Sequence, residues 1–235
     1  MKENIYTIPI NDAFAADCEC PLCEFMSKEE KNKIEYSLGA SMMEPDERIV
    51  SNERGYCQRH TQMMYDFGNK LSHALVLETR LKYIEEKISK YSKCIKKPKK
   101  ALFSSKEPSD AFTLSQTCVV CERLDKIQKD FVANLFYLYK KDPEFKEKFF
   151  NSKGFCLPHF EYLANLAYTH LSPDAGYEFL EKLCKLQIDN LARVTEDVEW
   201  FTKKFDYRYK DADWKNSKDA VIRGSLKISG YIEEK

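Results

Sequence analysis

Apolar residues recur every three or four positions over long stretches of this chain, with charged residues between them. The clearest stretch runs from Pro173 to about Phe205, and a similar one runs from Leu71 to Tyr91. This spacing places the apolar side chains on one face of an α-helix. The residues predicted to be buried are Leu180, Leu183, Leu191, Val194, Val198, Phe201 and Phe205 in the later helix, and Leu71, Leu75, Leu81, Ile84 and Ile88 in the earlier one.

Start and stop signals predict further helices. Pro21 suits the first turn of a helix that runs to about Leu38, and a second helix follows Cys118 and ends near Lys141. A short helix is expected around residues 46–50, and another in the tail, over residues 220–228. Since glycine and proline are scarce, the pattern predicts an all-α fold.

Composition narrows the possible classes of protein. The 38 basic and 38 acidic residues cancel, so no overall field attracts nucleic acid. No segment approaches the roughly 18 apolar residues that span a bilayer, and Asn11 and Asp12 interrupt any signal-peptide core. We therefore expect a cytoplasmic protein that binds no membrane and is unlikely to bind nucleic acid.

A set of four potential metal ligands occurs twice. The chain contains 9 cysteines and 4 histidines, and each set pairs a C-x-x-C segment with a later C-x-x-H segment. Three thiolates and one imidazole form a typical tetrahedral Zn²⁺ site, so we expect two zinc ions per chain. The predicted sites are Cys20, Cys23, Cys57 and His60 in the first half, and Cys118, Cys121, Cys156 and His159 in the second.

Residues around these ligands repeat as well. Asp12-Ala13-Phe14 returns as Asp110-Ala111-Phe112, at the same offset of 98 residues as the C-x-x-C segments, and the C-x-x-H segments repeat at an offset of 99. A fixed period across unrelated positions indicates an internal duplication. The predicted division is a first zinc-binding repeat over 1–92, a linker over 93–108, a second repeat over 109–205 and a tail over 206–235 with a possible short docking helix.

Each half-site is predicted to lie where a helix begins. Backbone N–H groups at a helix N-terminus stabilise a thiolate, which suits a metal ligand. The two segments of a set are separated by 33 and 34 residues, unlike the roughly 12 of DNA-reading fingers. With four protein ligands, neither zinc keeps an open position for catalysis, so both are expected to be structural, each holding together the two helix N-termini of its own half.

Other candidate residues have simpler interpretations. Cys18, Cys94 and Cys184 are left over from the ligand sets, and Cys184 is expected in the core. Asp12 is interpreted as a cap or turn former with Phe14 packed nearby, while Tyr56 and Phe155 are expected to shield the metals. His73 and His170 do not repeat and are expected to be ordinary surface or core histidines.

Several segments together resemble a known family. They are Ile5 to Phe14, Cys20-Pro21-Leu22-Cys23-Glu24, Gly154 to Phe160, and Trp200 to Arg208. The chain resembles, over nearly its whole length, a bacterial domain-of-unknown-function family that is common in anaerobic Gram-positive organisms. Its members sometimes carry a label as ABC-transporter substrate-binding proteins, which fits poorly with the missing export signal. The resemblance implies no established activity.

Three functions remain open at this point. The first is a non-catalytic zinc-binding protein that serves as an interaction or scaffold module for an unknown protein partner. The second is a redox or zinc sensor that acts through its zinc-bound thiolates. The third is a nucleic-acid-binding protein that uses the lysine-rich linker and the Tyr207 to Lys210 segment. An enzyme is not expected, because no nucleophile with a base, phosphate loop or paired carboxylates can be identified.

Overall fold

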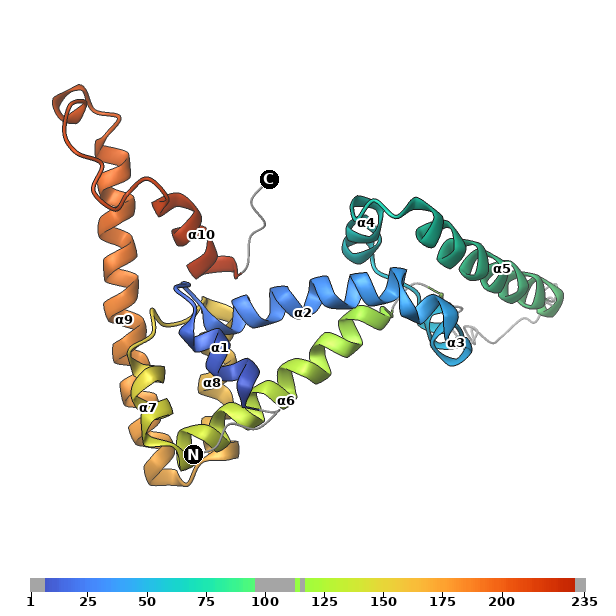
Figure 1. Ribbon diagram of the computed structural model, residues 1–235, viewed down its shortest axis with the longest axis horizontal. Helices are drawn as coiled ribbons and strands as arrows, with labels where there is room; N and C mark the ends of the chain where they lie inside the picture. Colours follow the sequence, from blue (N-terminus) through green and yellow to red (C-terminus); the bar gives the residue numbers. More distant parts are fainter. Residues whose placement is uncertain (1–6, 96–112, 115–116, 231–235) are drawn as a thin grey trace, which may run out of the picture. The chain divides into compact units, whose positions relative to one another are not determined.

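The computed structural model describes residues 7–95, 113–114 and 117–230, and this part of the chain consists of helices and connecting turns (Figure 1). The all-α prediction is confirmed. In chain order the elements are α1 (Ile8–Ala15), α2 (Pro21–Leu38), η1 (Ala40–Met43), α3 (Pro45–Arg54), α4 (Gln58–Asp66), α5 (Lys70–Cys94), α6 (Val119–Lys141), α7 (Pro143–Phe150), α8 (Leu157–His170), α9 (Pro173–Lys203), η2 (Tyr207–Tyr209) and α10 (Ala220–Ser229).

The predicted helices appear close to their expected bounds. Proline is the first residue of α2, α3, α7 and α9 and the second of α8, which fits the start of a helix, where its missing N–H costs nothing. The tail helix is α10. The predicted 93–108 linker lies outside the described residues beyond Ile95, as does the repeated Asp110-Ala111-Phe112 segment. None of the described helices is both long and apolar enough to cross a membrane.

Two compact units make up the chain, and they do not follow the predicted repeat boundaries. Unit 1 combines Met1–Lys28 with Ile127–Lys235, and unit 2 is Glu29–Lys126. Helices α2 and α6 each contribute residues to both units. Each unit therefore contains sequence from both predicted repeats, and the proposed division into 1–92 and 109–205 does not describe the packing.

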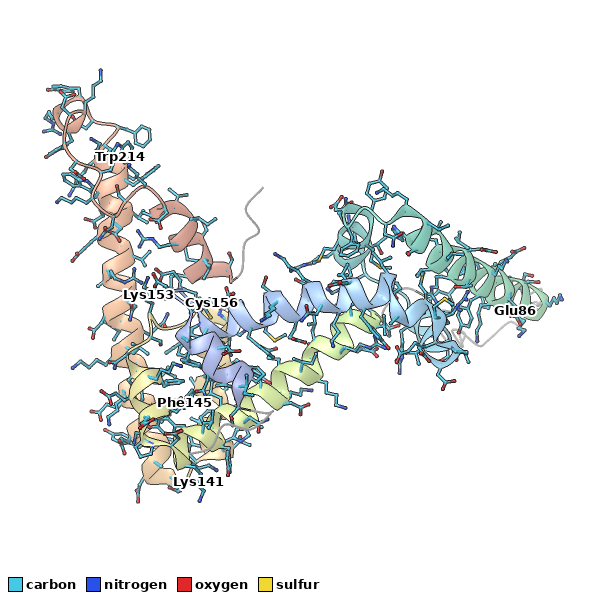
Figure 2. The ribbon with its side chains drawn as sticks, in the orientation of Figure 1. Glu86, Lys141, Phe145, Lys153, Cys156 and Trp214 are labelled. Carbon is cyan, nitrogen blue, oxygen red and sulfur yellow. The ribbon has the colours of Figure 1, made fainter. Side chains whose placement is uncertain are left out.

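Aromatic side chains fill the core of unit 1. Phe149 on α7 is fully buried and contacts the rings of Phe14, Phe155 and Phe179, with centroids 5.3 to 5.6 Å apart. Phe145, labelled in Figure 2, adds an edge-to-face contact to Phe14 at 5.2 Å. This cluster joins α1, α7 and α9 to the turn that leads into α8, so the hydrophobic effect stabilises the position of that turn.

Unit 2 has a smaller core around the start of α6. Ile34 and Leu38 on α2 pack with Met64 on α4 and with Val119 and Val120 on α6. The side chain of Arg80 on α5 adds polar contacts to backbone carbonyls of α3 and to the Leu114 carbonyl, the latter at 2.7 Å. Because the apolar core of unit 2 is small, polar contacts such as those of Arg80 contribute a larger share of its stability.

Two predicted burial patterns require correction. On α5 the expected buried residues are largely exposed, with 73% of Leu71 and 62% of Leu81 accessible. On α9 the buried face is set by Phe179, Leu183, Leu186, Gln187 and Val194. Leu191 on this helix and Phe205, just after its end, are exposed. Helical spacing marks an apolar face but does not show whether another element covers it.

Candidate metal centres

The eight predicted ligands gather in two clusters, but the halves exchange partners. Site 1 contains Cys20, Cys23, Cys156 and His159, and site 2 contains Cys57, His60, Cys118 and Cys121. The four ligand atoms of each site lie within 4.8 Å of one another. The predicted pairing within each half is therefore wrong: each C-x-x-C segment meets the C-x-x-H segment of the other half.

The long helices explain this exchange. With 18 residues, α2 carries the chain about 27 Å away from Cys20 before the segment that leads to Cys57 begins. In unit 1 the start of α2 meets the middle of α6, where Phe25 stacks on Phe131 at 4.2 Å. In unit 2 the end of α2 meets the start of α6, where Arg123 lies over the Tyr36 ring. Each C-x-x-C segment thus lies beside the half-site that follows the other long helix.

All four half-sites lie at helix starts, as expected. Cys57 and Cys156 are the N-caps of α4 and α8, and the carbonyls of Cys20 and Cys118 accept the first helical bonds of α2 and α6. Glycine precedes each C-x-x-H segment with a left-handed backbone, at φ +71° for Gly55 and +76° for Gly154. A side chain at either position would also press on Arg80 or Gln187, so glycine is required twice.

Site 1 is the more buried of the two sites. Its three cysteines are buried, with sulfur atoms 3.8 Å apart for Cys20 and Cys156 and 3.5 Å apart for Cys23 and Cys156. Nδ1 of His159 lies 3.2 to 3.4 Å from all three sulfurs. Cys156 is labelled in Figure 2. Gln187 on α9 bonds both backbone groups of Phe155, which fixes the turn before Cys156.

Site 2 differs in having a carboxylate behind its histidine. Nδ1 of His60 lies 3.2 Å from the sulfurs of Cys57 and Cys118 and 3.4 Å from that of Cys121. On the other side of the ring, Nε2 is 2.9 Å from Oε1 of the buried Glu30, whose second oxygen accepts a bond from Arg59 at 2.6 Å. A carboxylate in this position fixes the ring and the tautomer that a metal ligand needs.

These spacings fit a tetrahedral zinc ion. Zinc–sulfur bonds of about 2.3 Å at tetrahedral angles place two sulfurs about 3.8 Å apart. The sulfur atoms are 3.5 and 3.8 Å apart in the two site 1 pairs and 3.9 Å apart for Cys57 and Cys121 in site 2. Three thiolates with one imidazole suit Zn²⁺ better than a hard, oxygen-preferring cation. Both clusters could hold a metal ion, and the donor set favours zinc.

The electrostatics of the metal-free chain also suit metal binding. Burial lowers the pKa of His60, but its hydrogen bonds to Cys118 and Glu30 outweigh that effect and raise the pKa to about 10. Burial raises the pKa of Cys118, yet the bond from His60 lowers it to about 6. For His159, burial lowers the pKa while Cys156 and Cys20 raise it to about 9. Each histidine thus faces thiolate charge, which a metal cation would stabilise.

The remaining candidate residues lie outside both clusters. Cys184 is exposed on α9, so its expected core position is wrong. Burial raises the pKa of Cys18 to about 11, which keeps this neighbour of site 1 a thiol. His73 is buried and His170 stacks on Phe136 at 4.9 Å, as expected of ordinary histidines. Asp12 lies inside α1 and does not cap it, while Phe155 is fully buried.

Glu30 and the charged residues around Glu19 were not among the predicted site residues. Glu30 precedes His60 by 30 residues and has no counterpart at the repeat offset, so no spacing signal could identify it. Glu19 directly precedes Cys20 and binds Arg193 and Lys227, which follow it by 174 and 208 residues. Only the tertiary structure shows these contacts.

Comparisons with known proteins agree with the predicted resemblance. A model of the "Family of unknown function (DUF6062)" matches residues 1–235. Neither the search of curated proteins nor the search of solved structures found a match. Because the family model covers the whole chain, this protein belongs to that family of unknown function.

Proposed function

We propose that this protein is a non-catalytic zinc-binding helical module. Two structural zinc ions stabilise its helices, and the surface of those helices binds another protein. The observation that carries the zinc role is the closed ligand set at both clusters. Four protein ligand atoms lie within 4.8 Å of one another in each, which fills a tetrahedral shell and leaves no position for substrate.

The segments that the sites join support a structural role. In site 1 Cys156 lies 133 residues from Cys23 and 136 residues from Cys20 along the chain, so one zinc ion would close a very long loop in unit 1. In site 2 a zinc would add to the small core of unit 2. Binding energy at such sites is folding energy, because the unfolded chain does not bring the ligands together.

Metal analysis of the purified full-length chain tests this function. We expect two zinc ions per chain. Replacing Cys57 by Ser should remove one zinc and loosen unit 2 while site 1 keeps its metal, and replacing Cys156 by Ser should do the same for unit 1. Hydrogen exchange resolved by peptide reports each unit separately. Zinc-free protein with unchanged protection in both units would contradict the structural role.

The exposed apolar side chains of α5 support the interaction role. Leu71 and Leu81 are largely exposed, and Ile88 is 48% accessible. Large apolar side chains that stay exposed along one helix suggest a surface that binds another protein. A photo-reactive residue placed at Leu81 in cells should yield one dominant protein adduct, whereas the same residue at the exposed Lys90, half a turn around α5 from Leu81, should not. Absence of a specific adduct at Leu81 would contradict this role.

The unequal burial of the two sites favours a second candidate function, redox or zinc sensing at site 2. Cys57 and Cys121 are only partly buried, whereas all three cysteines of site 1 are buried. A peroxide would oxidise an accessible thiolate to a sulfenic acid, with reduction of the peroxide to water, and zinc would leave. Zinc release under mild peroxide should then come first from site 2. Equal, slow release from both sites would exclude sensing.

A further inference from the structure

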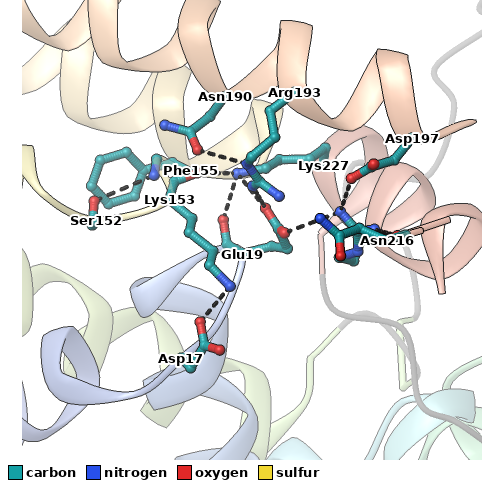
Figure 3. Close-up of polar contacts among 12 residues, drawn as sticks. Asp17, Glu19, Ser152, Lys153, Phe155, Asn190, Arg193, Asp197, Asn216 and Lys227 are labelled. Carbon is teal, nitrogen blue, oxygen red and sulfur yellow. Dashed lines mark hydrogen bonds and ion pairs between the residues drawn. The ribbon is translucent and has the colours of Figure 1, made fainter. Parts of the chain in front are cut away.

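Lys227, in the last turn of α10, is buried beside site 1 although it carries an ammonium group. Its side chain is 1% exposed, and Nζ donates to the Glu19 carbonyl at 2.7 Å and pairs with a Glu19 carboxylate oxygen at 3.1 Å. Nζ also donates to the Lys153 carbonyl. Glu19 directly precedes Cys20, and Lys153 lies three residues before Cys156. One ammonium group therefore ties together the two backbone segments that deliver the cysteines of site 1 (Figure 3).

Lys227 belongs to a cluster of charged side chains around Glu19. The Glu19 carboxylate also pairs with Arg193 at 2.6 Å, and Arg223 pairs with Asp197 at 2.9 Å and approaches Glu19 at 3.9 Å. Asp219, largely exposed, adds a surface pair to Arg223. Counted without Asp219, whose side chain is 64% exposed and screened by solvent, the cluster has the three cations Lys227, Arg193 and Arg223 against the two carboxylates of Glu19 and Asp197. Zinc with three thiolates and a neutral imidazole carries a charge of about −1, which this group would offset.

The end of α10 lies directly against the cysteines. Gly230 caps the helix with φ +89°, and a Cβ there would lie 3.8 Å from Sγ of Cys156 and 3.9 Å from Sγ of Cys23. A helix C-terminus carries a partial negative charge, which is unfavourable beside thiolates. A lysine in the last turn reverses that effect at the place where α10 meets the site.

We propose that Lys227 is a positioning residue for a zinc ion in site 1, where its ammonium group aligns the Cys20 and Cys156 segments and offsets the thiolate charge. Docking of α10 and zinc binding at site 1 then stabilise each other, because linked equilibria are reciprocal. The inference rests on the proposed zinc-binding function. Site 2 has Glu30 and Arg59 behind its histidine, and the residues described around it include no buried lysine, so it does not depend on Lys227 in this way.

The first test compares Lys227→Met with Lys218→Met in the full chain loaded with zinc. Lys218 is exposed and lies just before α10, so the control removes the same charge outside the site. A chromogenic chelator competes for zinc, and alkylation mapped by mass spectrometry identifies the cysteines that are released. We expect Lys227→Met to weaken one zinc by about ten- to hundredfold, with Cys20, Cys23 and Cys156 released, as for other residues that support metal ligands. The control should match the wild type.

The outcomes separate this inference from the proposed function. A wild-type chain without zinc would refute the proposed function itself. Wild-type affinity at both sites in Lys227→Met would overturn the role of Lys227 alone, as would equal weakening of both sites.

A second measurement needs no substitution. Removing zinc from the wild-type chain should increase hydrogen exchange over Ala220–Ser229, while Pro143–Phe150 in the aromatic core of unit 1 keeps more of its protection. Unchanged protection of α10 after zinc removal would overturn the linkage.

Discussion

At the scale of single residues, the two candidate metal sites have the same types of ligand, but different residues hold those ligands in place. His60 is held by Glu30, and Glu30 in turn by Arg59. For His159, the described part of the chain provides no carboxylate bonded to the ring. Site 1 is supported at backbone groups close to its cysteines, through the bonds of Gln187 to Phe155 and of Lys227 to Glu19. Since these contacts orient metal ligands, each site should respond to its own substitutions.

Replacing Glu30 by Gln should weaken zinc binding at site 2 by about ten- to hundredfold, because the amide fixes the His60 tautomer less well than a carboxylate does. Site 1 should keep its affinity. Chelator competition with mapped alkylation of Cys57, Cys118 and Cys121 measures the effect. Arg59→Gln, which leaves the Glu30 to His60 bond in place, should have a smaller effect, and an equal loss in both variants would contradict this ranking.

Zinc binding at site 2 should release at least two protons at pH 7. The pKa of His60 is raised to about 10, and that of Cys121 is raised to about 12 by burial and by the nearby Cys118 charge, so both hold a proton in the metal-free chain. Zinc must displace these protons, and its affinity should fall as the pH is lowered. Titration calorimetry in buffers of different ionisation enthalpy counts the protons. A zinc affinity that does not change with pH would contradict the presence of these protons in the metal-free chain.

At the scale of elements, α2 and α6 decide which half-sites meet. Phe131 on α6 is 5% exposed and stacks on Phe25 of α2 within unit 1. The helix bounds were predictable from Pro21 and from the spacing after Cys118. Their mutual packing was not, because the same apolar faces would also allow each half to fold by itself.

Replacing Phe131 by Ala should therefore destabilise unit 1 by about 3 to 5 kcal/mol, the usual cost of removing a buried ring. Tyr137→Ala on the same helix is the matched control, since Tyr137 is 46% exposed and should change stability by about 0.5 kcal/mol or less. Urea denaturation of the zinc-loaded chain measures both. Equal effects would show that α2 and α6 do not depend on this contact.

At the scale of the whole molecule, the exchanged half-sites make the two predicted repeats interdependent. Neither repeat alone contains a complete site, since site 1 takes Cys20 and Cys23 from the first and Cys156 and His159 from the second. Site 2 takes its ligands in the opposite order. A zinc ion at either site would thus bind residues of both repeats. We therefore expect neither repeat to fold fully without the other.

Dividing the chain between residues 98 and 99 tests this arrangement. Each fragment expressed alone should hold no zinc in a four-ligand site, whereas the two fragments expressed together should recover about two zinc ions per pair and copurify. Pairing within each half would give the opposite result, with one zinc in each separate fragment. Metal analysis after gel filtration distinguishes the two arrangements.

The sequence by itself determined the helical class, the bounds of α2, α6, α9 and α10, and all eight residues that form the clusters. These features depend on local spacing, on helix-start chemistry and on ligand type. Only the tertiary structure decided which half-sites pair, that Leu71 and Leu81 are exposed, and that Glu30 and Lys227 support the sites. The physical reason is that long helices separate neighbours in sequence by tens of ångströms, so contacts between distant segments depend on how those helices pack.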